Sequence, residues 1–197
     1  MTQSPGQQLI GIARSIGRGF ANLLNFHGRD GVALFWPYAF AIVVIVSFGT
    51  ALALDAPMRA TMQVMFDYVS AHPDQGSVMF GTNGASVRVR GFPPELAGQL
   101  WSIIVPTAGM VLAAVVLLSA AVVRRLRDGN RSFVWGLVPA LFAVLAFVLF
   151  PLLFDPSQAS GWVFFLLLAN NVLYIGFLIR LIVLLAGPSA PSPEVSS

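Results

Sequence analysis

Arginine supplies most of the chemistry that this sequence offers. Four arginines lie within Arg124–Ser132, close to an aspartate, and Arg29 lies far upstream. Guanidinium groups bind carboxylate and phosphate oxygens through paired hydrogen bonds. The cluster therefore either forms structural ion pairs, with Asp128 paired to Arg29, or binds an anionic lipid head group or phosphate. Its members are Arg29, Arg124, Arg125, Arg127 and Asp128.

A second polar group falls within an apolar stretch near the C-terminus. Asn170, Asn171 and Tyr174 share an arc of about 100° on a helix. Because lipid cannot satisfy amide groups, these side chains should face protein. Interhelical hydrogen bonds are one interpretation of this face, and a substrate pathway is the other.

A methionine stripe is the remaining candidate. Met58, Met62, Met65 and Val69 recur at helical spacing, and they either cover an apolar surface or bind a soft metal through thioethers. The chain has no cysteine and no H-E-x-x-H motif, paired acidic frame or Gly-rich phosphate loop. We therefore expect no enzyme activity, no cofactor and no metal centre.

Composition assigns the chain to the membrane proteins. Of 197 residues, 57% are hydrophobic and only 10% are charged, which is far more apolar than a soluble domain of this length. All 11 basic residues are arginine, a usage typical of a GC-rich genome. The excess of positive charge therefore does not indicate a nucleic-acid partner.

Hydrophobic runs divide the chain into four membrane spans. The expected fold class is an all-α membrane protein with four transmembrane helices, an amphipathic N-terminal helix and a periplasmic insertion made of a helix and a β-hairpin. Pro57 should open the insertion helix, and Asn83–Gly84 marks the hairpin turn. The segments are a cytoplasmic N-terminal segment, 1–33; the spans, 34–54, 103–123, 133–154 and 162–186; the insertion, 55–102; a cytoplasmic arginine loop, 124–132; a periplasmic turn, 155–161; and a disordered cytoplasmic tail, 187–197.

The N-terminal segment is amphipathic over residues 1–26. Arg14 and Arg18 lie on one side of the expected helix, opposite its apolar arc. A helix lying in the membrane surface and a helix docked on a partner subunit both fit this pattern. The arc consists of Leu9, Ile12, Ile16, Phe20, Leu23 and Leu24.

Arginine distribution predicts the orientation. With the N-terminus inside, eight of the 11 arginines lie in cytoplasmic segments, as the positive-inside rule requires. A tryptophan also stands near the start of each span, where indole rings anchor at lipid head groups: Trp36, Trp101, Trp135 and Trp162. Both termini are therefore expected in the cytoplasm.

Two short motifs stand out in the chain: Phe26–Arg29 with Phe35–Trp36, and Arg124–Asp128 with Ser132 and Trp135. Together they resemble the bacterial inner-membrane family called domain of unknown function 805. The family pattern runs roughly F-x-G-R-x-x-R-x-x-F-W and R-R-L-H-D-x-x-x-S-x-x-W, and this chain departs from it at Val32 and Arg127. The resemblance implies an inner-membrane location and a compact helical bundle, but no activity.

The expected function is that of an accessory or scaffolding subunit in a larger inner-membrane complex, such as a respiratory or photosynthetic one. Its partners are then the lipid bilayer and other membrane-protein subunits. The methionine stripe, the hairpin and the first helix offer the interaction surfaces. The alternative is a small transporter or lipid-binding protein with its site at the cytoplasmic arginines or at the Asn170 face.

Overall fold

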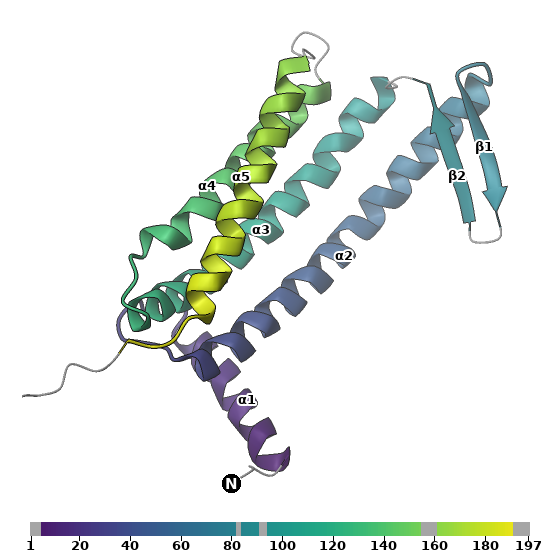
Figure 1. The fold of residues 1–197 in the computed structure, drawn as a ribbon. Coiled ribbons are helices and arrows are strands. Elements are labelled where there is room, and N and C mark those ends of the chain that lie inside the picture. The colour runs from purple at the N-terminus through teal and green to yellow at the C-terminus, as the bar shows by residue number, and fades with distance from the viewer. Residues whose placement is uncertain (1–4, 82–83, 91–93, 155–160, 191–197) are drawn as a thin grey trace, which may run out of the picture.

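Helices dominate the computed structural model, which describes residues 5–81, 84–90, 94–154 and 161–190 (Figure 1). The expected turn at 155–161 falls almost entirely outside these ranges, as do the hairpin turn residues 82–83 and most of the C-terminal tail. The elements in order are α1 (Pro5–Ala21), α2 (Val32–Ala71), β1 (Gly76–Gly81), β2 (Gly84–Val89), α3 (Pro94–Asp128), α4 (Val134–Leu149), the 3-10 helix η1 (Phe150–Phe154) and α5 (Gly161–Ala186).

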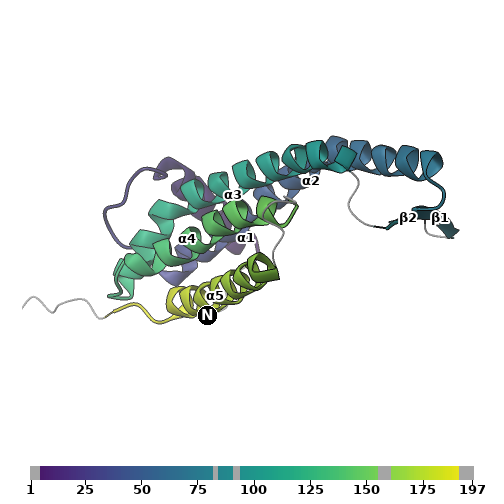
Figure 2. The ribbon, with the colours of Figure 1, turned by 90° about the horizontal axis from the view of Figure 1, so that it is seen from above.

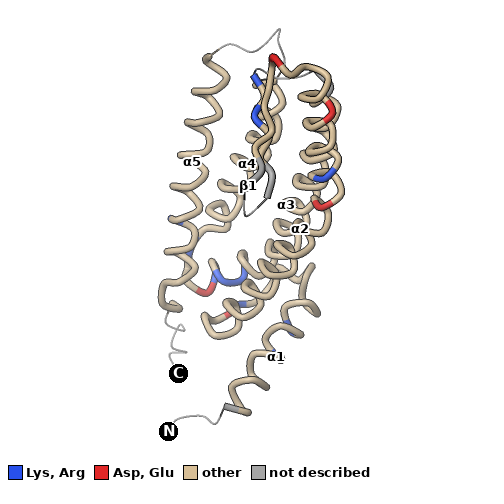
Figure 3. Tube along the Cα trace, turned by 90° about the vertical axis from the view of Figure 1, so that its right-hand side faces the viewer, with Lys and Arg blue, Asp and Glu red and all other residues tan. Residues whose placement is uncertain are grey.

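Four helical segments are long and apolar enough to cross a membrane: α2, α3, α4 with η1, and α5. Their most apolar stretches have mean hydropathies between 2.1 and 2.7, and at most 22% of any stretch is buried inside the protein. Charged residues gather at the two ends of the molecule, with an uncharged middle between them (Figure 3). The chain is a multi-pass helical membrane protein, which confirms the class expected from composition.

The first spanning helix is much longer than expected. The prediction ended it at residue 54 and opened a separate helix at Pro57, whereas α2 runs unbroken to Ala71 over 40 residues. Pro57 removes one backbone donor, and the neighbouring turns hold the helix across that gap. At 1.5 Å per residue α2 is roughly 60 Å long, about twice the hydrocarbon thickness. It extends past the other helices at the end that carries the hairpin (Figures 1 and 2).

The arginine loop is shorter than expected, because α3 continues to Asp128. Arginine is a good helix former and is favoured at the negative C-terminal end of a helix. The turn that follows is a Schellman motif. Asn130 has a left-handed φ of 53°, and its N–H donates to the Arg127 carbonyl at 3.0 Å. The N–H of Arg131 donates to the Leu126 carbonyl at 2.7 Å.

The expected hairpin is present. β1 and β2 pair antiparallel with Val78 opposite Val87, and Gly81 opposite Gly84 leaves two residues for the turn. The hairpin packs on the C-terminal part of α2, where a Cβ built on Gly76 would lie 2.6 Å from a Val69 methyl group. A two-stranded sheet is only marginally stable by itself, and the contact with α2 supports it.

The buried core lies at one end of the bundle. It joins the first turns of α2 to the last turns of α3 and α5, and the Tyr38 hydroxyl donates to the Leu117 carbonyl at 2.7 Å. Elsewhere the sides of the bundle expose apolar residues, as lipid-facing helices do. The core residues are Phe35, Tyr38, Ala39, Ile42, Ala121, Leu126, Leu181 and Leu185.

Helix α1 crosses the start of α2 and projects away from the bundle (Figures 1 and 3). The Ser15 hydroxyl donates to the Leu34 carbonyl at 2.7 Å. A Cβ at Gly19 would lie 2.1 Å from the Tyr38 ring, so glycine is required for this crossing. Of the expected apolar arc, two residues are half-buried and four are exposed: Leu9, Ile12, Phe20 and Leu24.

Candidate functional site: arginines at the packed end of the bundle

Arg124 joins α3 to the loop between α1 and α2. Its side chain is buried, and its Nε donates to Asp30 Oδ2 at 2.6 Å. Its Nη1 donates to the carbonyls of Asn22, at 2.9 Å, and Asn25. Arg18 of α1 lies 3.9 Å from the other oxygen of Asp30. The loop therefore wraps around one guanidinium, with a buried carboxylate to balance its charge.

Arg125 joins α3 to the end of α5. It is only 1% exposed, and its Nη1 pairs with Asp128 one turn along the helix. Its Nε donates to the Leu185 carbonyl at 2.9 Å, and its Nη2 donates to the Gly187 carbonyl. The cation thus caps the negative end of α5. The Ser189 hydroxyl also donates to Asp128, which fixes the chain just beyond α5.

The structure pairs Asp128 with Arg125, not with Arg29 as the sequence suggested. Residues three apart share one face of a helix, so Arg125 and Asp128 meet within α3. Arg29 lies in the loop held by Arg124, and Asp30 is the loop residue that reaches α3. The sequence argument missed Asp30 and Ser189. Asp30 directly follows Arg29 in the sequence, and nothing in the residues around it indicates that its side chain is buried.

Three other arginines surround an open pocket at this end. Arg29, Arg127 and Arg131 line a pocket of about 370 Å³ together with Gly28 and Asn130. All five residues are exposed, and none of them is acidic. The structure therefore divides the predicted cluster: Arg124, Arg125 and Asp128 form buried ion pairs, whereas the other two predicted arginines join Arg131 around an open pocket.

The polar face predicted on α5 is reduced to one interhelical contact. Asn170 is 3% exposed, and its Nδ2 donates to the Phe142 carbonyl of α4 at 3.1 Å. Its Oδ1 has no hydrogen-bond partner among the described residues. Asn171 instead donates to the Leu167 carbonyl of its own helix, and Tyr174 is half-buried. Of this face, Asn170 is therefore the one residue that makes a hydrogen bond between the two helices in the described part of the chain.

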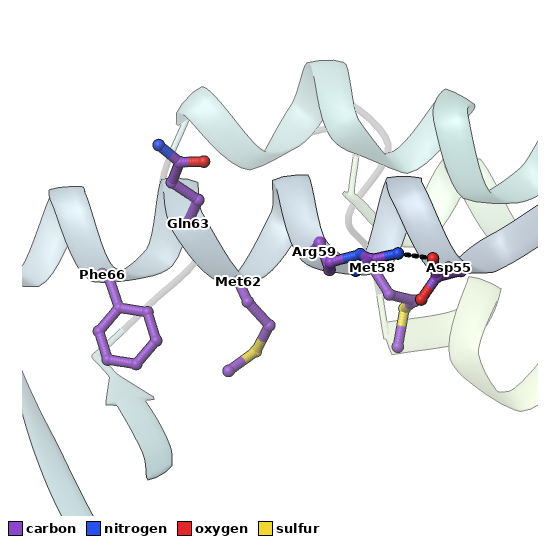
Figure 4. A pocket seen from close by; sticks show the side chains of 6 residues that line it. All are labelled: Asp55, Met58, Arg59, Met62, Gln63 and Phe66. Carbon is purple, nitrogen blue, oxygen red and sulfur yellow. Dashed lines mark ion pairs between the residues drawn. The ribbon is translucent and has the colours of Figure 1, made fainter.

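The methionine stripe is also divided. Val69 is buried, and Met65 lines a hollow of about 520 Å³ that is shared with the hairpin. Met58 and Met62 point to one side of α2 together with Phe66 (Figure 4). These three side chains line a second hollow, of about 450 Å³, which also contains the ion pair between Asp55 and Arg59.

The fold and the buried arginine pairs define a small multi-pass helical membrane protein whose helices are tied together at one end. No protein-family model, curated protein or solved structure matches the chain. Within the described ranges, no group of three His, Cys, Asp or Glu side chains is placed to hold a metal ion. The chemistry that this end of the molecule displays is that of guanidinium groups, which bind anions.

Proposed function

We propose that this protein is a non-catalytic accessory or scaffolding subunit of a larger assembly in the bacterial inner membrane. The observation that carries the proposal is an exposed apolar line on α2, which we call the methionine face: Met58, Met62 and Phe66 (Figure 4). This face lies on the part of α2 that extends beyond the membrane span.

The length of α2 supports this placement. Residues 31–54 carry no charge, and a helix of that length covers roughly 36 Å, enough to cross the hydrocarbon core. The charged residues Asp55 and Arg59 follow at once, and the helix continues for roughly another 25 Å to Ala71. Most of the methionine face therefore stands outside the hydrocarbon.

The methionine face, standing outside the hydrocarbon core, is stabilised when another apolar surface packs on it. Met58 is 53% exposed and Met62 is 37% exposed, although both stand where water or lipid head groups would surround them. Exposed apolar patches of this kind mark interaction sites, and methionine adapts to a partner surface because its side chain is flexible. A neighbouring subunit with an apolar segment outside the membrane fits this face.

The sidedness of the proposal rests on charge. Both α1 and the C-terminal end of α5 lie at the arginine end of the bundle (Figure 3). Arginine-rich segments resist translocation, so this end is cytoplasmic and the hairpin is periplasmic. The similarity of Phe26–Arg29 and Arg124–Asp128 to domain of unknown function 805 supports the inner membrane as the location.

Purification from native membranes in a mild detergent tests the proposal. We expect the protein to co-purify with a partner at fixed stoichiometry, and the Met58→Gln/Met62→Gln variant to lose that partner. Asp67→Ala is the matched control, because Asp67 is exposed on the same helix and does not line this hollow. A lone particle that takes up a specific small molecule would overturn the proposal, as would equal retention of the partner by both variants.

One observation favours a second candidate function, that of a lipid-binding membrane protein. The exposed arginine pocket at the cytoplasmic end has the charge that an anionic head group requires. An accessory subunit can also bind lipid, so the two functions do not exclude each other.

A further inference from the structure

We propose that Arg29, Arg127 and Arg131 form a binding site for a phosphate group, carried by an anionic lipid head group or by free phosphate. We call these three residues the arginine pocket. The inference rests on the lipid-binding candidate for this same pocket and deepens it. It does not depend on the accessory role, because the pocket lies at the opposite end of the molecule from the methionine face.

The balance of charge at this end is the first argument. Among the described residues, the two carboxylates at this end are Asp30 and Asp128. Both are buried, and each pairs with its own buried arginine. In the described part of the chain no carboxylate pairs with any of the three pocket arginines. Three like charges around one hollow repel each other, and an anion bound between them removes that repulsion.

The donors of the pocket are the second argument. Arg127 uses Nη1 to donate to the Phe26 carbonyl, which is its one hydrogen bond from the side chain within the described residues. Arg29 and Arg131 make no side-chain hydrogen bond there. A phosphate group offers several acceptor oxygens, and guanidinium groups bind such oxygens in pairs. Arg124 and Arg125 are unsuitable as ligands, because both are buried and already donate to aspartates and backbone carbonyls.

The backbone conformation fixes where Arg29, Arg127 and Arg131 lie along the rim of the pocket. Gly28 has a φ of 89°, a left-handed conformation that turns the loop just before Arg29. Asn130, also left-handed, sets the Schellman turn just before Arg131. The bond from Arg127 to Phe26 joins the two turns. Two fixed turns and one cross-link thus hold the backbone around the pocket, and a preorganised backbone lowers the cost of binding.

The volume of the pocket, about 370 Å³, fits a phosphate group with the start of a glycerol moiety. The pocket lies at the end of α3, where a cytoplasmic helix end meets the lipid head groups under the proposed orientation. Phosphatidylglycerol presents this chemistry from the membrane, and inorganic phosphate presents it from the cytoplasm. Phosphatidylcholine carries a phosphate too, but its positive choline group opposes the arginines.

The experiment uses the full-length protein purified in neutral detergent, and its readout is native mass spectrometry of bound lipid together with thermal melting. One arm titrates phosphatidylglycerol in mixed micelles, with phosphatidylcholine as the neutral comparison. The other arm titrates inorganic phosphate. The test variant is Arg29→Gln/Arg127→Gln/Arg131→Gln. The matched control is Arg59→Gln/Arg88→Gln/Arg90→Gln, which removes the same charge from the other end of the molecule.

We expect affinity for phosphatidylglycerol to fall by about tenfold or more in the test variant and to stay unchanged in the control. Protection by inorganic phosphate as well would show that the site takes free phosphate, and protection by phosphatidylglycerol alone would assign it to lipid. Either result supports the site. Equal affinities in the two variants, equal losses in both, or no binding by the parent protein would overturn it.

A smaller variant keeps the test valid if the triple change unfolds the protein. Arg29→Gln/Arg131→Gln removes no side-chain hydrogen bond between described residues, so its melting temperature should match the parent protein in the absence of ligand. We expect it to bind phosphatidylglycerol several-fold more weakly. The Arg29→Lys/Arg131→Lys variant keeps the charge and should recover part of the loss. Binding that is the same in both double variants would contradict the proposal.

Discussion

Arg124 and Arg125 are adjacent on α3, and they hold two different parts of the chain. Arg124 bonds to Asp30 and the loop after α1, whereas Arg125 bonds to Asp128 and the end of α5. Successive side chains of a helix point about 100° apart, so one pair of residues can face two neighbours. The helices of this membrane protein are thereby tied at one end by two buried cations.

Breaking the ion pair between Arg124 and Asp30 should destabilise the protein strongly. Arg124→Gln leaves the buried Asp30 carboxylate with only the more exposed Arg18, at 3.9 Å, and removing one partner of a buried pair costs about 3 kcal/mol. We expect a lower melting temperature and faster hydrogen exchange in residues 22–31. Arg59→Gln is the control, because the Arg59–Asp55 pair is exposed and worth at most about 1 kcal/mol. The prediction fails if the two variants melt alike.

Breaking the ion pair between Arg125 and Asp128 should release the end of α5 and leave the loop between α1 and α2 in place. Asp128→Asn weakens the bond to Arg125 and the acceptor that Ser189 uses. We therefore expect faster hydrogen exchange at residues 185–190 and little change at residues 22–31. Asp67→Asn, an exposed aspartate outside these pairs, provides the control. Equal effects on both segments would show that the two arginine pairs do not act separately.

The Schellman turn after α3 requires a residue that tolerates a left-handed backbone conformation at position 130. Asn130 has a φ of 53°, where a β-branched side chain is strained. We expect Asn130→Gly to keep the melting temperature or raise it slightly, and Asn130→Val to lower stability by about 1–2 kcal/mol. Denaturant unfolding of the three proteins measures the difference. A valine variant as stable as the glycine variant would contradict the left-handed assignment.

Local signals predicted the parts of this fold that depend on short sequence windows. Hydropathy located the four spans, and Asn83–Gly84 located the hairpin, because both features are encoded within a few neighbouring residues. Pro57 misled the prediction, since one missing backbone donor does not end a helix that its flanking turns support. The contact of Arg124 with Asp30 was not predictable, because the two residues are 94 positions apart and only the packing of α2 on α3 brings them together.

The crossing of α1 over α2 should depend on Gly19. A Cβ at that position overlaps the Tyr38 ring, so Gly19→Leu should push α1 off the bundle and expose the Ser15 contact with Leu34. Gly17 is the matched control, because nothing lies within 4 Å of a Cβ there. Gly17→Ala should leave α1 in place and strengthen the helix by roughly 0.5–1 kcal/mol. Hydrogen exchange across residues 5–21 separates the two results.

The orientation can be tested with single cysteines, because the chain contains none of its own. Ser132 lies in the turn after α3 and Ser77 lies in β1, and both are exposed. If arginine-rich segments stay in the cytoplasm, a maleimide that cannot cross membranes should label Ser77→Cys in spheroplasts. Ser132→Cys should be labelled only after permeabilisation, and the cysteine-free parent should give no signal. The reverse pattern would invert the topology and place the arginine pocket on the periplasmic face.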